Sequence, residues 1–334
     1  FGFESLTNDI QPTMDGGFLA TGVAFSDLPD EHIEGGVFLS RDVFLARLDA
    51  EGVFDWGIIP VMMGYQSGHD VKPLQDGGFV IAGINHDLQT DRSTCLVIRT
   101  DANASIRWMR NLAPDYTGAE CSVIEQTTDG GFILLGKKLS YDHPVWIARL
   151  DADGYILWEG EWYSSYGVIG HWPFTRMTDV SETKDGDFIF VGEGISRDIS
   201  VPGYQAEILV NHLCIEFCGG GPFFNYRFPF PYPDNSDPSY PPVDLMGKVE
   251  PSILQIDEKG ILIAAGYLMM RYQDSPRYEW SEPYPDGFPG GPAIPLSDGT
   301  IFVQSKPDLP EPFGYFGPRV NRDDLCVMKI DIAQ

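Results

Sequence analysis

The chain has 334 residues, with 49 acidic and 22 basic side chains and a formal net charge of −27. Hydrophobic residues make up 43% and aromatic residues 13% of it. This excludes a disordered chain, because disordered chains lack the apolar side chains that stabilise a core. The negative charge disfavours nucleic acid as a partner, because a binder of polyanions needs a basic surface. No apolar stretch in the sequence reaches the length of a membrane span.

The sequence begins at Phe1 without a basic and apolar leader. A secreted protein begins in this way once its signal peptide has been removed, although a choice of numbering would look the same. We therefore expect an extracellular or cell-surface location after signal-peptide removal. The five cysteines leave at least one thiol unpaired within a monomer.

Two motifs recur along the chain. The first is Asp-Gly-Gly-Phe, followed by three further residues and a glycine. Strong copies begin at Asp15, Asp76 and Asp129, a looser copy at Asp185, and weaker copies at Glu258 and Asp298. The second motif is an apolar run that ends in an aspartate and a turn. A tryptophan follows that aspartate by seven residues in three copies, as Trp56, Trp108 and Trp158.

Each repeat predicts four short strands. In the third repeat they are 122–127, 132–135, 145–150 and the stretch around Ile156 and Trp158. Asp-Gly and Gly-Gly pairs supply the positive φ angles of tight hairpin turns. We expect the turn residues to be structural: Asp15, Gly16, Asp76, Gly77, Asp129, Gly130, Asp185 and Gly186. The three tryptophans are expected to serve in packing, with stacking on sugars as the alternative.

The repeat predicts an all-β protein with a single β-propeller domain over residues 1–334. The strand 43–48 is apolar on both faces except for Arg47, which indicates sheets on both sides of it. Six four-stranded blades are favoured, and the count falls to five if residues 271–320 form one long insertion. The chain ends on a third strand, so we expect the N-terminal strand, Phe1–Ser5, to supply the missing fourth and close the ring.

The long connections between strands fall on one face, including proline-rich insertions around 222–248 and 270–324. Binding sites usually lie on such loops, so this loop-rich face is the hypothesis for a site. Tolerated surface insertions are the alternative interpretation.

The sequence carries none of the common catalytic motifs. The six histidines show no metal-binding spacing, and no nucleophile or phosphate-loop motif occurs. We therefore predict no catalytic, cofactor-binding or metal-binding residue. Asp151 to Gly154 resembles the start of a calcium loop but lacks the later ligands, so a plain turn is favoured and calcium stays the alternative. Cys95 and Cys121 both lie near the loop-rich face and form a candidate disulfide. Asn103 begins a glycosylation triplet.

The two motifs together resemble repeats of secreted and surface β-propeller proteins of bacteria and archaea, and more distantly kelch-like and quinoprotein-like propellers. The resemblance covers residues 1–192 strongly and 250–334 weakly, and 193–249 departs from it. It implies the fold and an extracellular setting. It carries over no catalytic residue, because the recurrent positions are turns and packing positions.

The favoured function is that of a non-enzymatic extracellular or cell-surface propeller acting through protein contacts. A self-assembling subunit of a sheath, surface layer or filament is one such protein, and its partner would be copies of itself or another surface protein. The alternative is a propeller that binds or cleaves polysaccharide, with carboxylates and aromatic side chains on the loop-rich face. A calcium-dependent adhesion module is a third hypothesis.

Overall fold

The structure is a computed structural model of the chain. It describes residues 5–26, 40–60, 62, 64–112, 118–139, 145–162, 174–184, 186–196, 205–213, 224–229, 252–257, 260–265, 268–272, 278–283, 293–295, 300–303 and 326–329. The described part consists of strands and turns, and it contains no helix that could cross a membrane.

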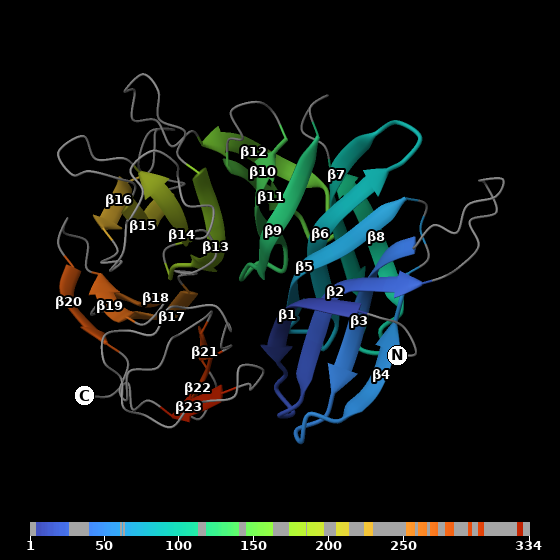
Figure 1. The fold of residues 1–334 in the computed structure, drawn as a ribbon, viewed down its shortest axis with the longest axis horizontal. Helices are drawn as coiled ribbons and strands as arrows, with labels where there is room; N and C mark the ends of the chain where they lie inside the picture. Colours follow the sequence, from blue (N-terminus) through green and yellow to red (C-terminus); the bar gives the residue numbers. More distant parts are fainter. Residues whose placement is uncertain are drawn as a thin grey trace. The chain divides into compact units, whose positions relative to one another are not determined.

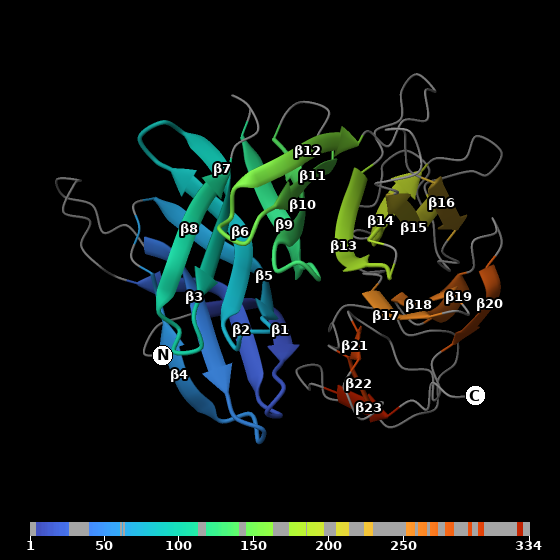
Figure 2. The ribbon, with the colours of Figure 1, turned by 180° about the vertical axis from the view of Figure 1, so that it is seen from behind.

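The strands form six antiparallel sheets in which each strand pairs with its neighbour in the sequence (Figures 1 and 2). The first sheet is β1 (Ser5–Pro12), β2 (Phe18–Ser26), β3 (Ser40–Leu48) and β4 (Phe54–Ile58). The second sheet is β5 (Tyr65–Pro73), β6 (Phe79–Asp87), β7 (Arg92–Thr100) and β8 (Ile106–Leu112). The third sheet is β9 (Ala119–Gln126), β10 (Phe132–Lys138), β11 (Val145–Leu150) and β12 (Ile156–Trp162).

The later sheets repeat this order. The fourth sheet is β13 (Phe174–Glu182), β14 (Phe188–Ser196), β15 (Gln205–Leu213) and β16 (Phe224–Pro229). The fifth is β17 (Ser252–Asp257), β18 (Gly260–Ala265), β19 (Leu268–Tyr272) and β20 (Tyr278–Pro283). The sixth has three described strands, β21 (Ala293–Pro295), β22 (Thr300–Val303) and β23 (Cys326–Lys329).

The number of sheets agrees with six repeats. Residues 271–320 hold β20, β21 and β22, so the hypothesis of one long insertion there is wrong. β19 supplies the third strand of the fifth sheet. The predicted closing strand at the N-terminus falls mostly on residues 1–4, outside the described residues. Ser5 itself begins β1 and pairs with Ala24 of β2.

Asp-Gly pairs turn the chain between the first two strands of a sheet. In the first sheet the Gly16 N–H donates to the Thr13 carbonyl, and the Thr13 N–H donates to the Gly17 carbonyl. Gly16 has a φ of 89°, and the glycines at the same position of the next two turns, Gly77 and Gly130, have 81° and 85°. Side chains other than glycine rarely adopt this conformation, which explains the recurrent Asp-Gly pair.

The glycine that ends the first motif faces a β-bulge in the first strand. In the second sheet the bulge lies at His69, between the pairs Gly68–Gly83 and Asp70–Ala82. A Cβ atom on Gly83 would lie 2.0 Å from the Ser67 carbonyl oxygen. A Cβ atom on Gly22 would lie 2.0 Å from the Leu6 carbonyl oxygen, and one on Gly136 would lie 2.1 Å from the Glu120 carbonyl oxygen. The motif therefore ends in glycine because the bulged strand approaches too closely for a side chain.

The core lies between sheets stacked face to face, and alternation along each strand divides its side chains between two neighbours. In β7, Leu96 and Ile98 pack with the first sheet, whereas Cys95 and Val97 pack with the third sheet. Such a strand is buried on both faces, which accounts for its continuous apolar sequence.

The chain divides into two compact units, residues 1–164 and 165–334. Unit 1 contains the first three sheets, and unit 2 contains the last three. Within unit 2, β17 lies against β13 and β14, and β21 lies against β17. The single-domain prediction for residues 1–334 stays a prediction.

Candidate functional site

An arginine of the second motif pairs with the aspartate of the first motif in each of the first three sheets. Arg47 pairs with Asp15, Arg99 with Asp76 at 2.6 Å, and Arg149 with Asp129 at 2.5 Å. Each pair joins the third strand to the turn between the first two strands. The predicted turn aspartates therefore have a second role. Each forms an ion pair with the arginine that interrupts the apolar third strand of its sheet.

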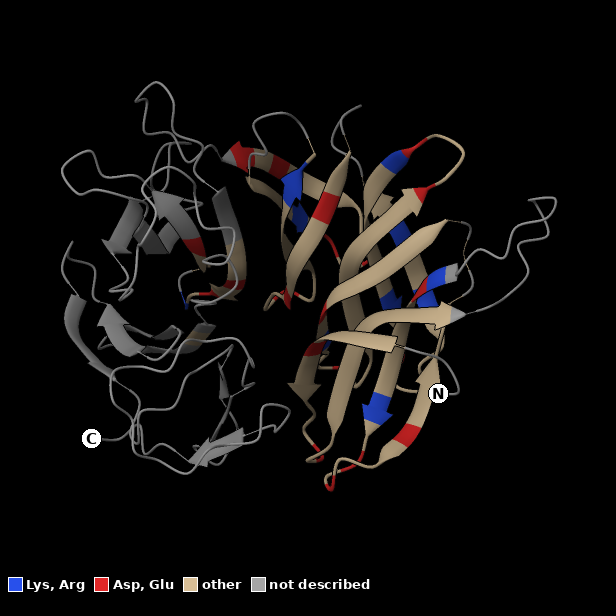
Figure 3. Cartoon of the chain, viewed as in Figure 1, with Lys and Arg blue, Asp and Glu red and all other residues tan. Residues whose placement is uncertain are grey.

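In the first and third sheets, these ion pairs and the turn hydrogen bonds lower the pKa of the turn aspartate. The Gly131 N–H, the Thr127 hydroxyl and the Arg149 guanidinium lower the pKa of Asp129 to about 2. Hydrogen bonds from Arg47 and Thr13 hold the pKa of Asp15 well below its usual range. Figure 3 shows acidic residues in the turns at the lower end of the strands of the first sheet.

The repeated tryptophans are half-buried on the outer strands, and the first two of them contact the next sheet. Trp56 lies against Phe79 with ring centroids 5.9 Å apart, and Trp108 lies against Phe132 at 5.8 Å. The indole N–H of Trp108 donates to the Ala152 carbonyl at 3.1 Å. Trp158 lies on β12, paired with Arg149 of β11.

Polar side chains at the bulges link the first strands of neighbouring sheets. Asn8 Nδ2 donates to the Gly68 carbonyl at 2.7 Å, and Asp9 Oδ2 accepts the Val71 N–H at 3.0 Å. The next two sheets repeat this arrangement. His69 Nδ1 donates to the Cys121 carbonyl at 2.7 Å, and Asp70 Oδ2 accepts the Ile124 N–H at 2.7 Å. A bulge donor and the aspartate after it therefore form a two-part link between sheets.

The third sheet departs from this pattern. Its bulge residue is Ser122, whose hydroxyl donates to Leu135 of its own sheet, and Val123 takes the place of the aspartate. In unit 2 the aspartate returns: Asp179 Oδ2 accepts the Ile253 N–H at 2.8 Å. Three of the four first strands compared therefore carry the carboxylate link.

Asp9 and Asp70 form a pair of neighbouring carboxyl groups. Burial, followed by the negative charge of Asp70, raises the pKa of Asp9 to about 8. Lys72 opposes this rise, and its Nζ lies 3.7 Å from Asp70 Oδ1 and 3.8 Å from Glu125 Oε2. A carboxyl group that keeps its proton near neutral pH can act as a general acid. Here, however, both aspartates bind backbone N–H groups of the next sheet, as Asp179 does, so the arrangement fits a structural link better than a catalytic pair.

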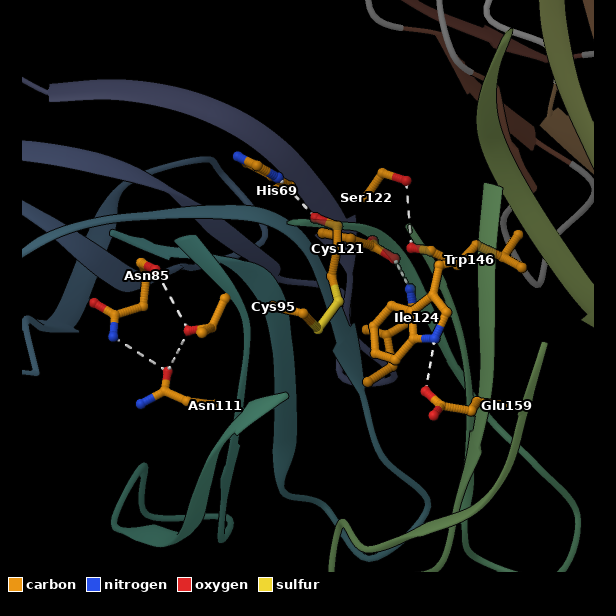
Figure 4. The surroundings of a disulfide bond; sticks show 12 residues. His69, Asn85, Cys95, Asn111, Cys121, Ser122, Ile124, Trp146 and Glu159 are labelled. Atoms are coloured by element: carbon orange, nitrogen blue, oxygen red, sulfur yellow. Dashed lines mark hydrogen bonds between the residues drawn. A yellow bond between two sulfur atoms is a disulfide. The ribbon is translucent and has the colours of Figure 1, made fainter. Parts of the chain in front are cut away.

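Cys95 of β7 and Cys121 of β9 form a disulfide between the second and third sheets, with Cα atoms 5.0 Å apart. Both side chains are fully buried. Figure 4 shows the bond beside Trp146, whose indole N–H donates to Glu159 at 2.9 Å, and below the His69 hydrogen bond to Cys121. A covalent bond and the two-part link thus join the same pair of sheets.

The aspartates of the links were not among the residues singled out from the sequence. Asp9, Asp70 and Asp179 each precede a turn aspartate by six residues, and this spacing is the signal that could have found them. Asp185, a predicted turn residue, lies outside the described residues, whereas Gly186 has a φ of 83°. The proline-rich insertions of the loop-rich face fall largely on residues that the structure does not describe.

Asp151, at the resemblance to a calcium loop, accepts the Asp153 and Tyr155 N–H groups with its Oδ1, both at 2.9 Å. This is the hydrogen bonding of an aspartate turn. Within the described part of the chain, no group of three or more His, Cys, Asp or Glu side chains is placed to hold a metal ion.

Comparison with known proteins gives the fold. No protein-family profile and no curated protein matches the chain. Among solved structures, the chain is similar to an α-L-arabinanase of Penicillium chrysogenum, with 11% identity, a TM-score of 0.55 and coverage of 89% of this chain and 88% of that one. It is also similar to an α-L-arabinofuranosidase of Fusarium graminearum, with 9% identity, a TM-score of 0.56 and coverage of 88% and 86%. Both are β-propellers, and together with the six repeated sheets they identify the fold of this chain as a β-propeller.

Proposed function

We propose that this chain is an extracytoplasmic β-propeller that works through protein contacts, with copies of itself or another surface protein as its partner. The observation that carries the proposal is a run of exposed apolar side chains at the start of β12. Tyr155, Ile156 and Leu157 are consecutive and 61%, 38% and 59% exposed. Consecutive exposed apolar residues are rare on soluble proteins unless they bind something.

The outer strand of each sheet in unit 1 carries an exposed apolar residue at the same place. Phe54, Ile106 and Ile156 each precede the repeated tryptophan by two residues, and they are 49%, 44% and 38% exposed. The outer strand is also the edge of its sheet, where backbone N–H and C=O groups can pair with another chain. In the first two sheets a charged residue, Asp55 or Arg107, stands where the third has Leu157, so the third sheet presents the most apolar edge.

The proposed location outside the cytoplasm rests on the disulfide between Cys95 and Cys121. Structural disulfides persist in oxidising compartments and are rare in the cytosol. The bond therefore supports an extracellular or cell-surface location for this chain.

The test is the assembly state of the full chain, measured by light scattering on a sizing column and by negative-stain microscopy. We expect wild-type assemblies that grow with concentration, and a shift towards monomer for the double variant Ile156→Thr, Leu157→Thr. The control is Leu88→Thr, which removes an exposed apolar side chain from the turn between β6 and β7 of the second sheet. A wild-type chain that stays monomeric up to about 100 µM, where weak self-association becomes measurable, would count against the proposal.

A second candidate is binding or cleavage of polysaccharide. It is favoured by the similarity to two arabinan-related enzymes, which concerns the fold. The site would lie on the loop-rich face, with carboxylates and aromatic side chains as its working groups. Release of reducing sugar from arabinan, or retention on a glycan array, would support this candidate independently of the assembly state.

A further inference from the structure

The turn between β7 and β8, residues 101–105, contains an acceptor sequence for a covalent modification. Asn103, Ala104 and Ser105 form an Asn-x-Ser triplet, the sequence that accepts an N-linked glycan. No other asparagine of the 334-residue sequence is followed two positions later by serine or threonine. A glycan attached through such a triplet is therefore confined to this turn.

The backbone of the turn is held by hydrogen bonds within the turn itself. The Asp101 N–H donates to the Ser105 carbonyl at 2.9 Å, and the Ala104 N–H donates to the Asp101 carbonyl at 3.0 Å. Asp101 Oδ1 accepts the N–H groups of Asn103 at 2.9 Å and of Ser105 at 3.0 Å. These bonds use the backbone and the Asp101 carboxylate, and none of them involves the side chain of Asn103 or Ser105.

Burial divides the triplet into one buried and two exposed residues. Ala104 is 8% exposed and packs in the core between the first two sheets, next to Trp56. Asn103 and Ser105 are exposed. The triplet requires the asparagine amide and the serine hydroxyl, whereas its middle residue can be any residue except proline. The two required residues are therefore the two that an enzyme can reach.

The same turn in the neighbouring sheets has a different composition. Residues 51–53 are Glu-Gly-Val in the first sheet, and residues 153–155 are Asp-Gly-Tyr in the third. In the third sheet, Arg110 of the preceding sheet donates to the Asp153 carbonyl at 2.8 Å. The corresponding residue before the second sheet, two positions after the repeated tryptophan, is Ile58, whose side chain has no donor. The acceptor triplet thus lies in a turn that lacks this arginine clamp.

We propose that Asn103 carries an N-linked glycan, attached during export of the chain; this rests on the location outside the cytoplasm proposed above. The donor is a sugar joined through phosphate to a lipid carrier. Asn103 Nδ2 forms the new bond to C1 of the sugar as the bond from C1 to the phosphate oxygen breaks. The lipid phosphate leaves with the electron pair of that bond, and the amide proton passes to a base of the transferase. The Ser105 hydroxyl is the group that the transferase recognises beside the amide.

The glycan would lie at the opposite end of the strands from the loop-rich face. Because the strands alternate in direction, the turn between β7 and β8 lies at the same end of the sheet as the turn between β5 and β6. A bulky hydrophilic group at the start of β8 would cover Ile106, which is 44% exposed, and the adjoining sheet edge. It would leave both the loop-rich face and the apolar edge of β12 open.

The test is mass spectrometry of the protein isolated from the cells that make it. Trypsin cleaves after Arg99 and Arg107 and releases residues 100–107, which contain Asn103 and no other asparagine. We expect this peptide to carry the added mass of a glycan in most copies of the exported chain. Exported protein whose peptide has the bare sequence mass would overturn the glycan and leave the proposed location standing. A chain found only in the cytoplasm would overturn the location, and the glycan with it.

Variants produced in the same cells test the amide and the hydroxyl separately. Asn103→Gln and Ser105→Ala should both lose the glycan, whereas Ser105→Thr should keep it, because threonine also supplies the hydroxyl. Ser105→Ala retains the backbone N–H that binds Asp101, so a loss there reports on the hydroxyl and not on the turn. The control is Asn111→Gln, which lies on the same strand outside the triplet and should keep the glycan. A glycan retained by Asn103→Gln or by Ser105→Ala would overturn the assignment.

Discussion

The indole ring of Trp108 meets the ring of Phe132 edge-on, at an interplanar angle of 79°. Trp108 belongs to the second motif of one repeat, and Phe132 is the aromatic residue of the first motif in the next repeat. Trp56 and Phe79 meet at the preceding boundary. The two motifs thus recur together because each completes the packing of the other across a boundary between sheets.

Replacing Trp108 should destabilise unit 1. Trp108→Leu removes the ring contact with Phe132 and the hydrogen bond to Ala152, and we expect a loss of about 2–3 kcal/mol in the free energy of unfolding. Trp108→Phe keeps a ring and removes the hydrogen bond, so it should cost about 1 kcal/mol. Denaturant unfolding measures both. Ile106→Thr, at an exposed position of the same strand, is the control, and equal losses in the two Trp108 variants would contradict the assigned ring contact.

Asp129 should contribute to acid stability. Its folded pKa, about 2, lies below the ordinary aspartate pKa of 3.8. The stabilisation is therefore present above the unfolded pKa and lost as the pH falls from about 4 to about 2. We expect the melting temperature of Asp129→Asn to fall less steeply over that range than that of the wild type. Asp153→Asn removes the same charge from an exposed turn, and it should leave the wild-type slope in place.

The turns and the strand order could be predicted from the sequence, because they depend on local chemistry. Asp-Gly pairs predicted the hairpins, and the apolar residues on both faces of β3 predicted burial of the sheet on both sides. Arg47 appeared as an exception within an apolar strand, since nothing local reveals that Asp15, far away in the sequence, is its partner.

The links between sheets were missed for a similar reason. Asp9 and Asp70 lie within strands whose pattern gives no sign of a bulge, and their partners are backbone N–H groups of another sheet. A backbone partner has no sequence signature. An aspartate six residues before the turn aspartate recurs in the first, second and fourth repeats. In the third repeat Val123 takes this position, although both motifs are well formed there.

His69 should tolerate asparagine better than alanine. Asn8, at the same bulge position of the first sheet, makes the equivalent hydrogen bond to Gly68. His69→Asn therefore keeps a donor for the Cys121 carbonyl, whereas His69→Ala leaves that carbonyl without it and should cost about 1 kcal/mol. Denaturant unfolding of the two variants measures the difference. An alanine variant as stable as the asparagine variant would show that the donor at this bulge does not stabilise the boundary.

The disulfide should be inert in the folded protein and stabilising overall. Cys95 and Cys121 are both 0% exposed, so a reductant reaches the bond only when the boundary between β7 and β9 opens. We expect alkylation mapped by mass spectrometry to label neither residue in native protein with a mild reductant, and to label both in denaturant. The double variant Cys95→Ala, Cys121→Ala should lose about 2–4 kcal/mol, because the bond closes a loop between residues separated by 26 positions. Rapid native-state labelling would mean that this boundary opens freely, and it would contradict the prediction.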